Sequence, residues 1–159
     1  MGPADDECQG GLTEREKRDN VIRLAFGGRK DLYDEFCKAI SEVIPPGTTV
    51  VLRGSAVTGT RWKDGAPFDA DGPGTSDLDL TLVGSDVIHF FKLTGFFVPE
   101  VHSRPMGTDD PDIAPGLQPL REKLMALVKR PVNIQASREI VLRFRGDLLD
   151  QPYLTLLQT

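Results

Sequence analysis

The sequence predicts a mixed α+β fold, with a small mixed β-sheet and helices packed mainly on one of its faces. Three observations support this class: apolar residues recur at helical spacing in several segments, short β-branched or alternating runs lie between those segments, and glycine and proline separate the two kinds. With 159 residues, 39% of them hydrophobic, the chain is long enough to bury one core. We therefore expect one domain over residues 13–159, preceded by a disordered leader over residues 1–12, which lacks periodic apolar positions.

Composition limits the partners and the location of the protein. The formal net charge of −5 provides no general attraction for a polyanion, so nucleic acid is not favoured as a ligand. No apolar run approaches the roughly 20 residues that a membrane-spanning helix requires, so we expect no membrane association. Because Cys8 and Cys37 are the two cysteines, a disulfide framework is not expected, and a reducing, cytoplasmic location is the simpler interpretation.

The first two predicted elements are helices. Thr13 and Glu16 have the spacing of a capping box, in which each side chain accepts from the backbone N–H of the other, and Gly27 ends the helix that follows. A second helix is predicted over residues 31–44, where apolar residues recur at helical spacing until the Pro-Pro-Gly sequence at 45–47 ends it.

The first predicted strand, residues 48–52, is β-branched and apolar and runs into Gly54 and Ser55. Glycine lets a phosphate approach the backbone closely, and the serine hydroxyl and nearby amide groups can donate hydrogen bonds to phosphate oxygens. Taken alone, such a turn is more often an ordinary strand-to-helix connection. The connection over residues 58–75 is rich in Gly, Pro and Asp, and connections of this length are usually functional or disordered.

Residues 77–83 alternate between polar and apolar side chains, which predicts a strand with Asp77, Asp79 and Thr81 on an exposed face. The two aspartates would lie roughly 6.6 Å apart along the strand. At an effective dielectric constant of about 20 they repel each other by roughly 2 kcal/mol. A divalent cation between them would turn this repulsion into attraction, so the pair is a candidate metal site; the alternative is a solvated strand face.

The remaining elements continue the alternation of helices and strands. In the strand predicted over residues 132–136, Asn133 and Gln135 lie on one face. The predicted elements are a short helix over 85–91, a helix over 117–128 after a region rich in Gly and Pro at 95–116, a strand over 132–136, a helix capped by Ser137, and a closing strand over 153–157.

Two segments, RGSAVTG at residues 53–59 and TSDLDL at residues 75–80, together resemble the signature of the DNA polymerase β-like nucleotidyltransferase superfamily. The resemblance extends over about residues 30–158 and implies a minimal nucleotidyltransferase domain. It implies that Gly54 and Ser55 bind the terminal phosphates of a nucleoside triphosphate such as ATP. It also implies that Asp77 and Asp79 are the catalytic residues and bind Mg²⁺ (or Mn²⁺).

The implied reaction is transfer of a nucleoside monophosphate to an acceptor hydroxyl, with pyrophosphate as the leaving group. The acceptor is expected to be a small molecule or a protein, because the chain has no room for the further domain with which most polymerising or RNA-modifying members hold their substrate. Four cations are candidates for contacting the triphosphate. We assign Arg61 and Lys63, in the connection over 58–75, to nucleotide binding; the other two candidates are Arg53 and Lys92.

The sequence departs from the family pattern at the third metal-binding position. Active members commonly have a third carboxylate on a later strand, where this chain has Asn133. We expect Asn133 to be a neutral metal ligand, because an amide oxygen can bind a cation but cannot act as a general base. This departure leaves a second interpretation open: a catalytically weak or inactive nucleotide-binding module that acts with a helical partner protein, as in toxin–antitoxin systems.

Overall fold

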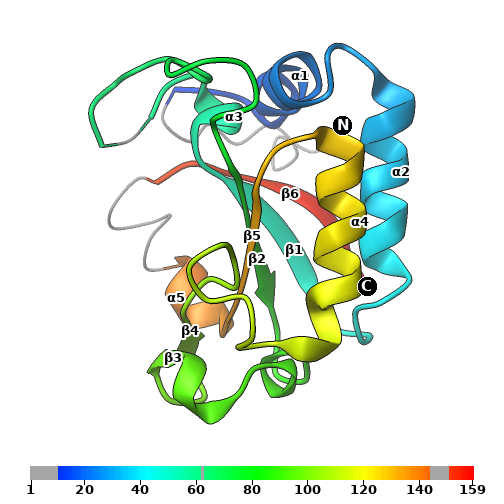
Figure 1. The fold of residues 1–159 in the computed structure, drawn as a ribbon, viewed down its shortest axis with the longest axis vertical. Helices are drawn as coiled ribbons and strands as arrows, with labels where there is room; N and C mark the ends of the chain where they lie inside the picture. The colour runs from blue at the N-terminus through cyan, green and yellow to red at the C-terminus, as the bar shows by residue number, and fades with distance from the viewer. Residues whose placement is uncertain (1–10, 62, 144–150) are drawn as a thin grey trace.

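The structure is a computed structural model that describes residues 11–61, 63–143 and 151–159 (Figure 1). Six strands form one sheet in the order β3-β4-β5-β2-β1-β6, in which β2 and β5 are parallel and the other neighbours are antiparallel. The mixed sheet and its helices confirm the predicted α+β class. The leader predicted over residues 1–12 lies almost entirely outside the described residues. The strands are β1 (Thr49–Arg53), β2 (Leu78–Val83), β3 (Phe96–Val98), β4 (His102–Ser103), β5 (Val132–Ser137) and β6 (Tyr153–Gln158).

The helices begin and end close to the predicted positions. The capping box is confirmed, since Thr13 Oγ1 accepts from the Glu16 N–H at 3.1 Å and Glu16 Oε1 accepts from the Thr13 N–H at 3.2 Å. The second helix ends at Ser41 rather than Ile44. No helix in the described part of the chain is long and apolar enough to cross a membrane. The α-helices are α1 (Glu14–Ala25), α2 (Lys30–Ser41), α3 (Ser55–Thr58), α4 (Gln118–Val128) and α5 (Glu139–Arg143).

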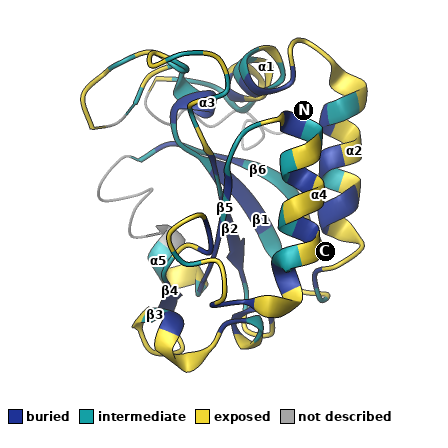
Figure 2. Cartoon of the chain, in the orientation of Figure 1, coloured by how far each residue is buried: buried dark blue, intermediate teal, exposed yellow. Residues whose placement is uncertain are grey.

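Helices α2 and α4 lie side by side against one face of the sheet and enclose the core with it (Figure 1). Leu78, Leu80 and Leu82 of β2 are at most 1% exposed and belong to this core. Figure 2 shows that the centre of the sheet is buried, whereas exposed residues lie on the loops and on the outer sides of the helices. Because alternate residues of a strand point to opposite faces, Asp79 and Thr81 lie on the other face of the sheet, where the candidate site is built.

Two regions differ from the predicted elements. The segment over 95–116 contains β3 and β4, which extend the sheet beyond β5. These strands are too short to show a periodic pattern, and β4 is defined by pairing of His102 with Ser137. Ser137 is accordingly the last residue of β5 rather than a helix cap, and its hydroxyl is hydrogen-bonded to the His102 ring. The helix predicted over 85–91 is a short 3-10 turn at Val87–Phe90.

Candidate functional site

Asp77 and Asp79, here called the acidic pair, point toward a common position. Asp79 of β2 is paired with Asn133 of β5 in the parallel part of the sheet. The side-chain amide of Asn133 donates to Asp77 Oδ2 at 2.7 Å and to Asp79 Oδ1 at 3.0 Å. One amide group can bridge two carboxylates only if both face it. The structure therefore brings together the three residues that the sequence assigned to the metal site.

The turn after β1 lies directly beside the acidic pair. Antiparallel pairing places Arg53, the last residue of β1, opposite Asp79. Gly54 follows with a φ of +101°, in the region that favours glycine, and a Cβ atom at this position would lie 3.2 Å from Asp79 Oδ2. A larger side chain would press on that carboxylate, so glycine keeps the space beside Asp79 open. The Gly-Ser turn after β1 therefore lies next to the Asp79 carboxylate of β2.

A pocket of about 190 Å³ opens at this junction. Its volume is below the roughly 300–1,000 Å³ typical of pockets for drug-sized molecules. A phosphate group or a short polyphosphate would fit within this volume. Ser55 is buried and is not among the lining residues. The pocket is lined by Arg53, Gly54, Thr58, Thr60, Asp79, Gln151 and Pro152.

Asp79 is poorly compensated as an anion. Burial raises the pKa of Asp79 above its ordinary value, and the neighbouring Asp77 carboxylate raises it further. The hydrogen bond from Asn133 and the positive charge of Arg53 lower this pKa, but they do not cancel the effect of burial and repulsion. A cation bound between the two carboxylates would favour the ionised form of both.

The donor atoms of the acidic pair and Asn133 suit a Mg²⁺ ion that arrives with a nucleotide. Within the described residues, no three His, Cys, Asp or Glu side chains are grouped so that they could hold a metal ion by themselves. Mg²⁺ is usually held by one or two carboxylates together with waters and substrate phosphates, so two aspartates are sufficient in number. The amide nitrogen of Asn133 faces the carboxylates, while its oxygen packs against Gly107, where an added Cβ atom would clash with it. Asn133 must rotate its amide before its oxygen can contact a cation.

A hydrogen-bonded polar network closes the same face of the sheet beyond the acidic pair. Arg53 donates to Gln135 Oε1 at 3.3 Å, and Gln135 Nε2 donates to the Ser103 carbonyl at 3.0 Å. Gln135 is 7% exposed, and Thr81, its partner across the strands, is 3% exposed. The prediction that Thr81 lies on an exposed face is therefore wrong, because Gln135 and its network cover this part of β2. Among the described residues, Asp79 is the residue of β2 that is not fully buried, and Asp77, just before the strand, is exposed.

Arg61 and Lys63, which the sequence assigned to nucleotide binding, lie in the connection over 58–75. Arg61 pairs with two aspartates of its own connection, Asp64 at 3.2 Å and Asp71 at 3.1 Å, and Lys63 is exposed. Neither residue lines the pocket. In Figure 1 this connection extends outward beside α3. The assignment of Arg61 and Lys63 to nucleotide binding stays a prediction.

Arg130, which no local sequence pattern marks, fixes the end of this connection that leads into Asp77 and β2. Its side chain is 7% exposed, and it donates to the two carboxylate oxygens of Asp69 at 2.8 and 3.1 Å and to the Ser76 carbonyl at 2.8 Å. The guanidinium also lies 4.4 Å from the centre of the Phe68 ring. Hydrogen bonds from Arg130 lower the pKa of Asp69 to about 2. These four residues, here called the loop anchor, fix the backbone immediately before Asp77.

Comparison of the chain with protein-family models, with curated proteins and with solved structures found no match. The two sequence motifs and the geometry in which they meet are therefore the basis for a functional proposal.

Proposed function

We propose that the protein is a Mg²⁺-dependent (or Mn²⁺-dependent) nucleotidyltransferase of the DNA polymerase β-like superfamily. It would transfer a nucleoside monophosphate from a triphosphate to an acceptor hydroxyl and release pyrophosphate. One observation carries the proposal: two motifs that are separate in the sequence meet at one pocket, where Gly54 lies against the Asp79 carboxylate. A Gly-Ser turn and two facing carboxylates are the groups that a triphosphate and its cation require.

Each group has a role that follows from its chemistry. The Gly54 backbone would bind phosphate oxygens, because glycine permits a close approach. Ser55 is buried and does not line the pocket, so its hydroxyl would have to turn toward the phosphates before it could donate a hydrogen bond. The acidic pair and, after rotation of its amide, Asn133 would hold Mg²⁺, which supplies positive charge that stabilises the entering and departing oxygens. The protein itself contributes positioning, so no protein nucleophile is required.

The proposed partners are a nucleoside triphosphate such as ATP and an acceptor that is a small molecule or another protein. Nucleic acid is not favoured, because the net charge of the chain is −5. We place the protein in the cytoplasm, because two cysteines do not make a disulfide framework; Cys37, the one within the described residues, is a free thiol.

A second candidate is a nucleotide-binding module with weak or no catalysis, which acts with a helical partner protein as in toxin–antitoxin systems. One observation favours it: the third metal position is occupied by Asn133, whose amide nitrogen donates to both aspartates. A neutral amide cannot accept the proton of an acceptor hydroxyl, so this site lacks a general base at that position.

Pyrophosphate release distinguishes the two candidates. The purified full chain is incubated with each of the four common triphosphates and Mg²⁺ or Mn²⁺, beside a double variant carrying Asp77→Asn and Asp79→Asn. Asp34→Asn, which changes an exposed carboxylate of α2, is the matched control. Release that disappears in the double variant and persists in the control supports the enzyme. Saturable nucleotide binding without release supports the module, and the absence of both contradicts both candidates.

A further inference from the structure

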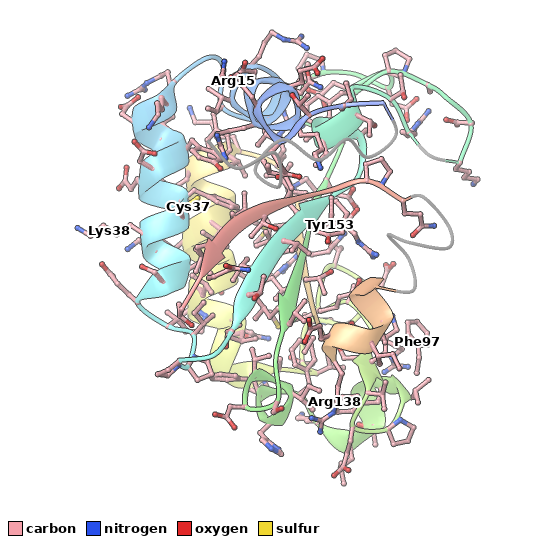
Figure 3. All side chains as sticks on the ribbon, turned by 180° about the vertical axis from the view of Figure 1, so that it is seen from behind. Arg15, Cys37, Lys38, Phe97, Arg138 and Tyr153 are labelled. Atoms are coloured by element: carbon pink, nitrogen blue, oxygen red, sulfur yellow. The ribbon has the colours of Figure 1, made fainter. Side chains whose placement is uncertain are left out.

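Arg53 is placed to contact an anion in the pocket. It is the cation among the described lining residues, and it lies at the end of β1 between Asp79 of β2 and Tyr153 of β6. Figure 3 shows Tyr153 at the start of β6, beside the end of β1.

Gln135 holds the Arg53 side chain in a defined direction. The Ser103 carbonyl can only accept a hydrogen bond, so the Gln135 amide must turn its nitrogen toward Ser103. The Gln135 oxygen then faces Arg53, from which it accepts at 3.3 Å. Because Gln135 is 7% exposed and its nitrogen also lies 3.4 Å from the His102 ring, a reversed amide would lose its partner at Ser103.

A cation is needed here because Asp79 is, apart from Arg53, the charged residue among the described residues that line the pocket. A divalent ion would compensate the acidic pair, but a triphosphate brings further negative charge that the neutral Gly54 and Ser55 cannot balance. A guanidinium is suited to this task, since its planar fork of N–H donors matches two phosphate oxygens at once. Arg61 does not meet the need in this arrangement, because it does not line the pocket.

We propose that Arg53 is the phosphate-binding cation of this pocket and that Gln135 is a positioning residue that aims it at the polyphosphate. The inference rests on the proposed function, since it names a further contact of the same nucleotide. The ligand class is a linear polyphosphate, whether free or attached to a nucleoside, and the base is not part of this contact.

The test is calorimetric titration of the full chain with inorganic tripolyphosphate and, separately, with ATP and Mg²⁺. Arg53→Met is expected to weaken binding of both ligands by about 10- to 100-fold, because it removes charge-assisted hydrogen bonds and keeps the length of the side chain. Arg53→Lys is expected to recover part of the lost affinity, since lysine restores the positive charge but lacks the planar N–H donors of a guanidinium. Arg29→Met, which removes an exposed arginine beside α2, is the matched control and is expected to bind as the wild type does. Thermal unfolding verifies that each variant is folded.

The role of Gln135 is tested by a double-mutant cycle. Gln135→Met is expected to weaken tripolyphosphate binding by about 3- to 10-fold in the wild type. It is expected to have almost no effect in the Arg53→Met background, because a positioning residue acts only through the group that it positions. Equal losses in both backgrounds would show that Gln135 is merely structural and would overturn this part of the inference.

The outcomes separate this inference from the proposed function. If the wild type binds ATP with Mg²⁺, and the double variant at the acidic pair loses that binding while Arg53→Met retains it, the inference is overturned and the proposed function stands. If the wild type binds neither ligand, the proposed function fails, and the inference fails with it. Loss of tripolyphosphate binding in Arg53→Met with normal binding in Arg29→Met supports the inference.

Discussion

Asp69 and Asp79 have opposite surroundings, although both belong to the part of the chain that leads into β2. Asp69 accepts hydrogen bonds from Arg130 and from the Gly74 and Ser76 N–H groups, and these bonds lower its pKa to about 2. Asp79 is half-buried beside a second carboxylate with the Asn133 amide as its hydrogen-bond donor, and its pKa is raised. The Asp69 carboxylate therefore accepts several hydrogen bonds, including two from a charged donor, whereas the described donor to Asp79 is one neutral amide.

This difference separates a structural carboxylate from a candidate ligand-binding one. Buried polar groups that lack compensating partners reduce stability, and proteins retain them mainly where a ligand completes the site. We infer that the loop anchor serves the stability of the fold and that the acidic pair serves binding. Substitutions in the two places should therefore have opposite consequences for stability and for activity.

The largest expected effect is loss of activity at the acidic pair. The double variant Asp77→Asn, Asp79→Asn is expected to lower the rate of nucleotidyl transfer by at least about 100-fold, because both charged metal ligands are removed. Its melting temperature should equal or exceed that of the wild type, since repulsion between the carboxylates is relieved. Pyrophosphate release and calorimetric unfolding measure the two quantities, and a variant that keeps its rate would contradict the role of the acidic pair.

The next effect is loss of stability at the loop anchor. Arg130→Met is expected to lower the free energy of unfolding by about 2 kcal/mol, because the partly buried Asp69 carboxylate would lose its charged hydrogen-bond donor. Arg61→Met is the matched control: its ion pairs are more exposed, so a much smaller loss is expected. Urea unfolding compares the two variants. If the two variants lose similar free energies of unfolding, burial of Arg130 does not determine how much the loop anchor stabilises the fold.

Much of the fold is predictable from local patterns. The alternation in residues 77–83 and 132–136 predicts β2 and β5, and the spacing of Thr13 and Glu16 predicts the start of α1, because these signals depend on residues close in the sequence. β3 and β4 are too short to show a period. β3 pairs with the neighbouring β4, and β4 joins the sheet through the pairing of His102 with the distant Ser137. Ser137 was misassigned as a helix cap for the same reason, since its partner His102 is far away in the sequence.

Some residues of the candidate site are likewise predictable from local sequence patterns, and others are not. Gly54 and the acidic pair are recognisable because each motif is continuous in the sequence, and their convergence follows from the pairing of two adjacent strands. Arg130 could not be identified, because it contacts Asp69 and Ser76 across a long separation and no local pattern marks it. Long-range side-chain contacts of this kind depend on packing, which a single sequence does not display.

A smaller effect is expected where Asn133 contacts the acidic pair. Asn133→Asp places a third carboxylate beside two others, so the metal-free protein is expected to be less stable than the wild type. The added charge is expected to strengthen Mn²⁺ binding by about tenfold, because cation affinity rises with the number of charged ligands. Unfolding with and without Mn²⁺, in the presence of a non-hydrolysable ATP analogue, measures both changes. A variant that Mn²⁺ does not stabilise would show that a cation does not bind at this position.

The dependence of stability on pH should also differ in sign between the two aspartates. The pKa of Asp69 is lowered from 3.8 to about 2, so its contribution is present above about pH 4 and is lost as the pH falls through 2. The pKa of Asp79 is raised, so its ionised form destabilises the folded protein, and this cost disappears as the pH falls through the raised pKa.

Near neutral pH, Asp69→Asn should therefore be less stable than the wild type and Asp79→Asn more stable. Urea unfolding over a pH series measures the two differences. As the pH falls, the difference in free energy of unfolding between Asp79→Asn and the wild type should disappear first. The corresponding difference for Asp69→Asn should disappear only at lower pH. If Asp79→Asn is the less stable of the two variants at neutral pH, the acidic pair is not under electrostatic strain.

The most direct test is binding of Mn²⁺ to the full chain in the presence of a non-hydrolysable ATP analogue, followed by the loss of the free Mn²⁺ signal in electron paramagnetic resonance beyond the loss that the analogue alone causes. We predict that the wild type takes up Mn²⁺ only when the nucleotide is present, because the acidic pair and the phosphates complete one coordination shell. We also predict that Asp79→Asn abolishes this uptake. Mn²⁺ uptake that is absent in the wild type, or unchanged in Asp79→Asn, would contradict a nucleotide and cation site at the acidic pair.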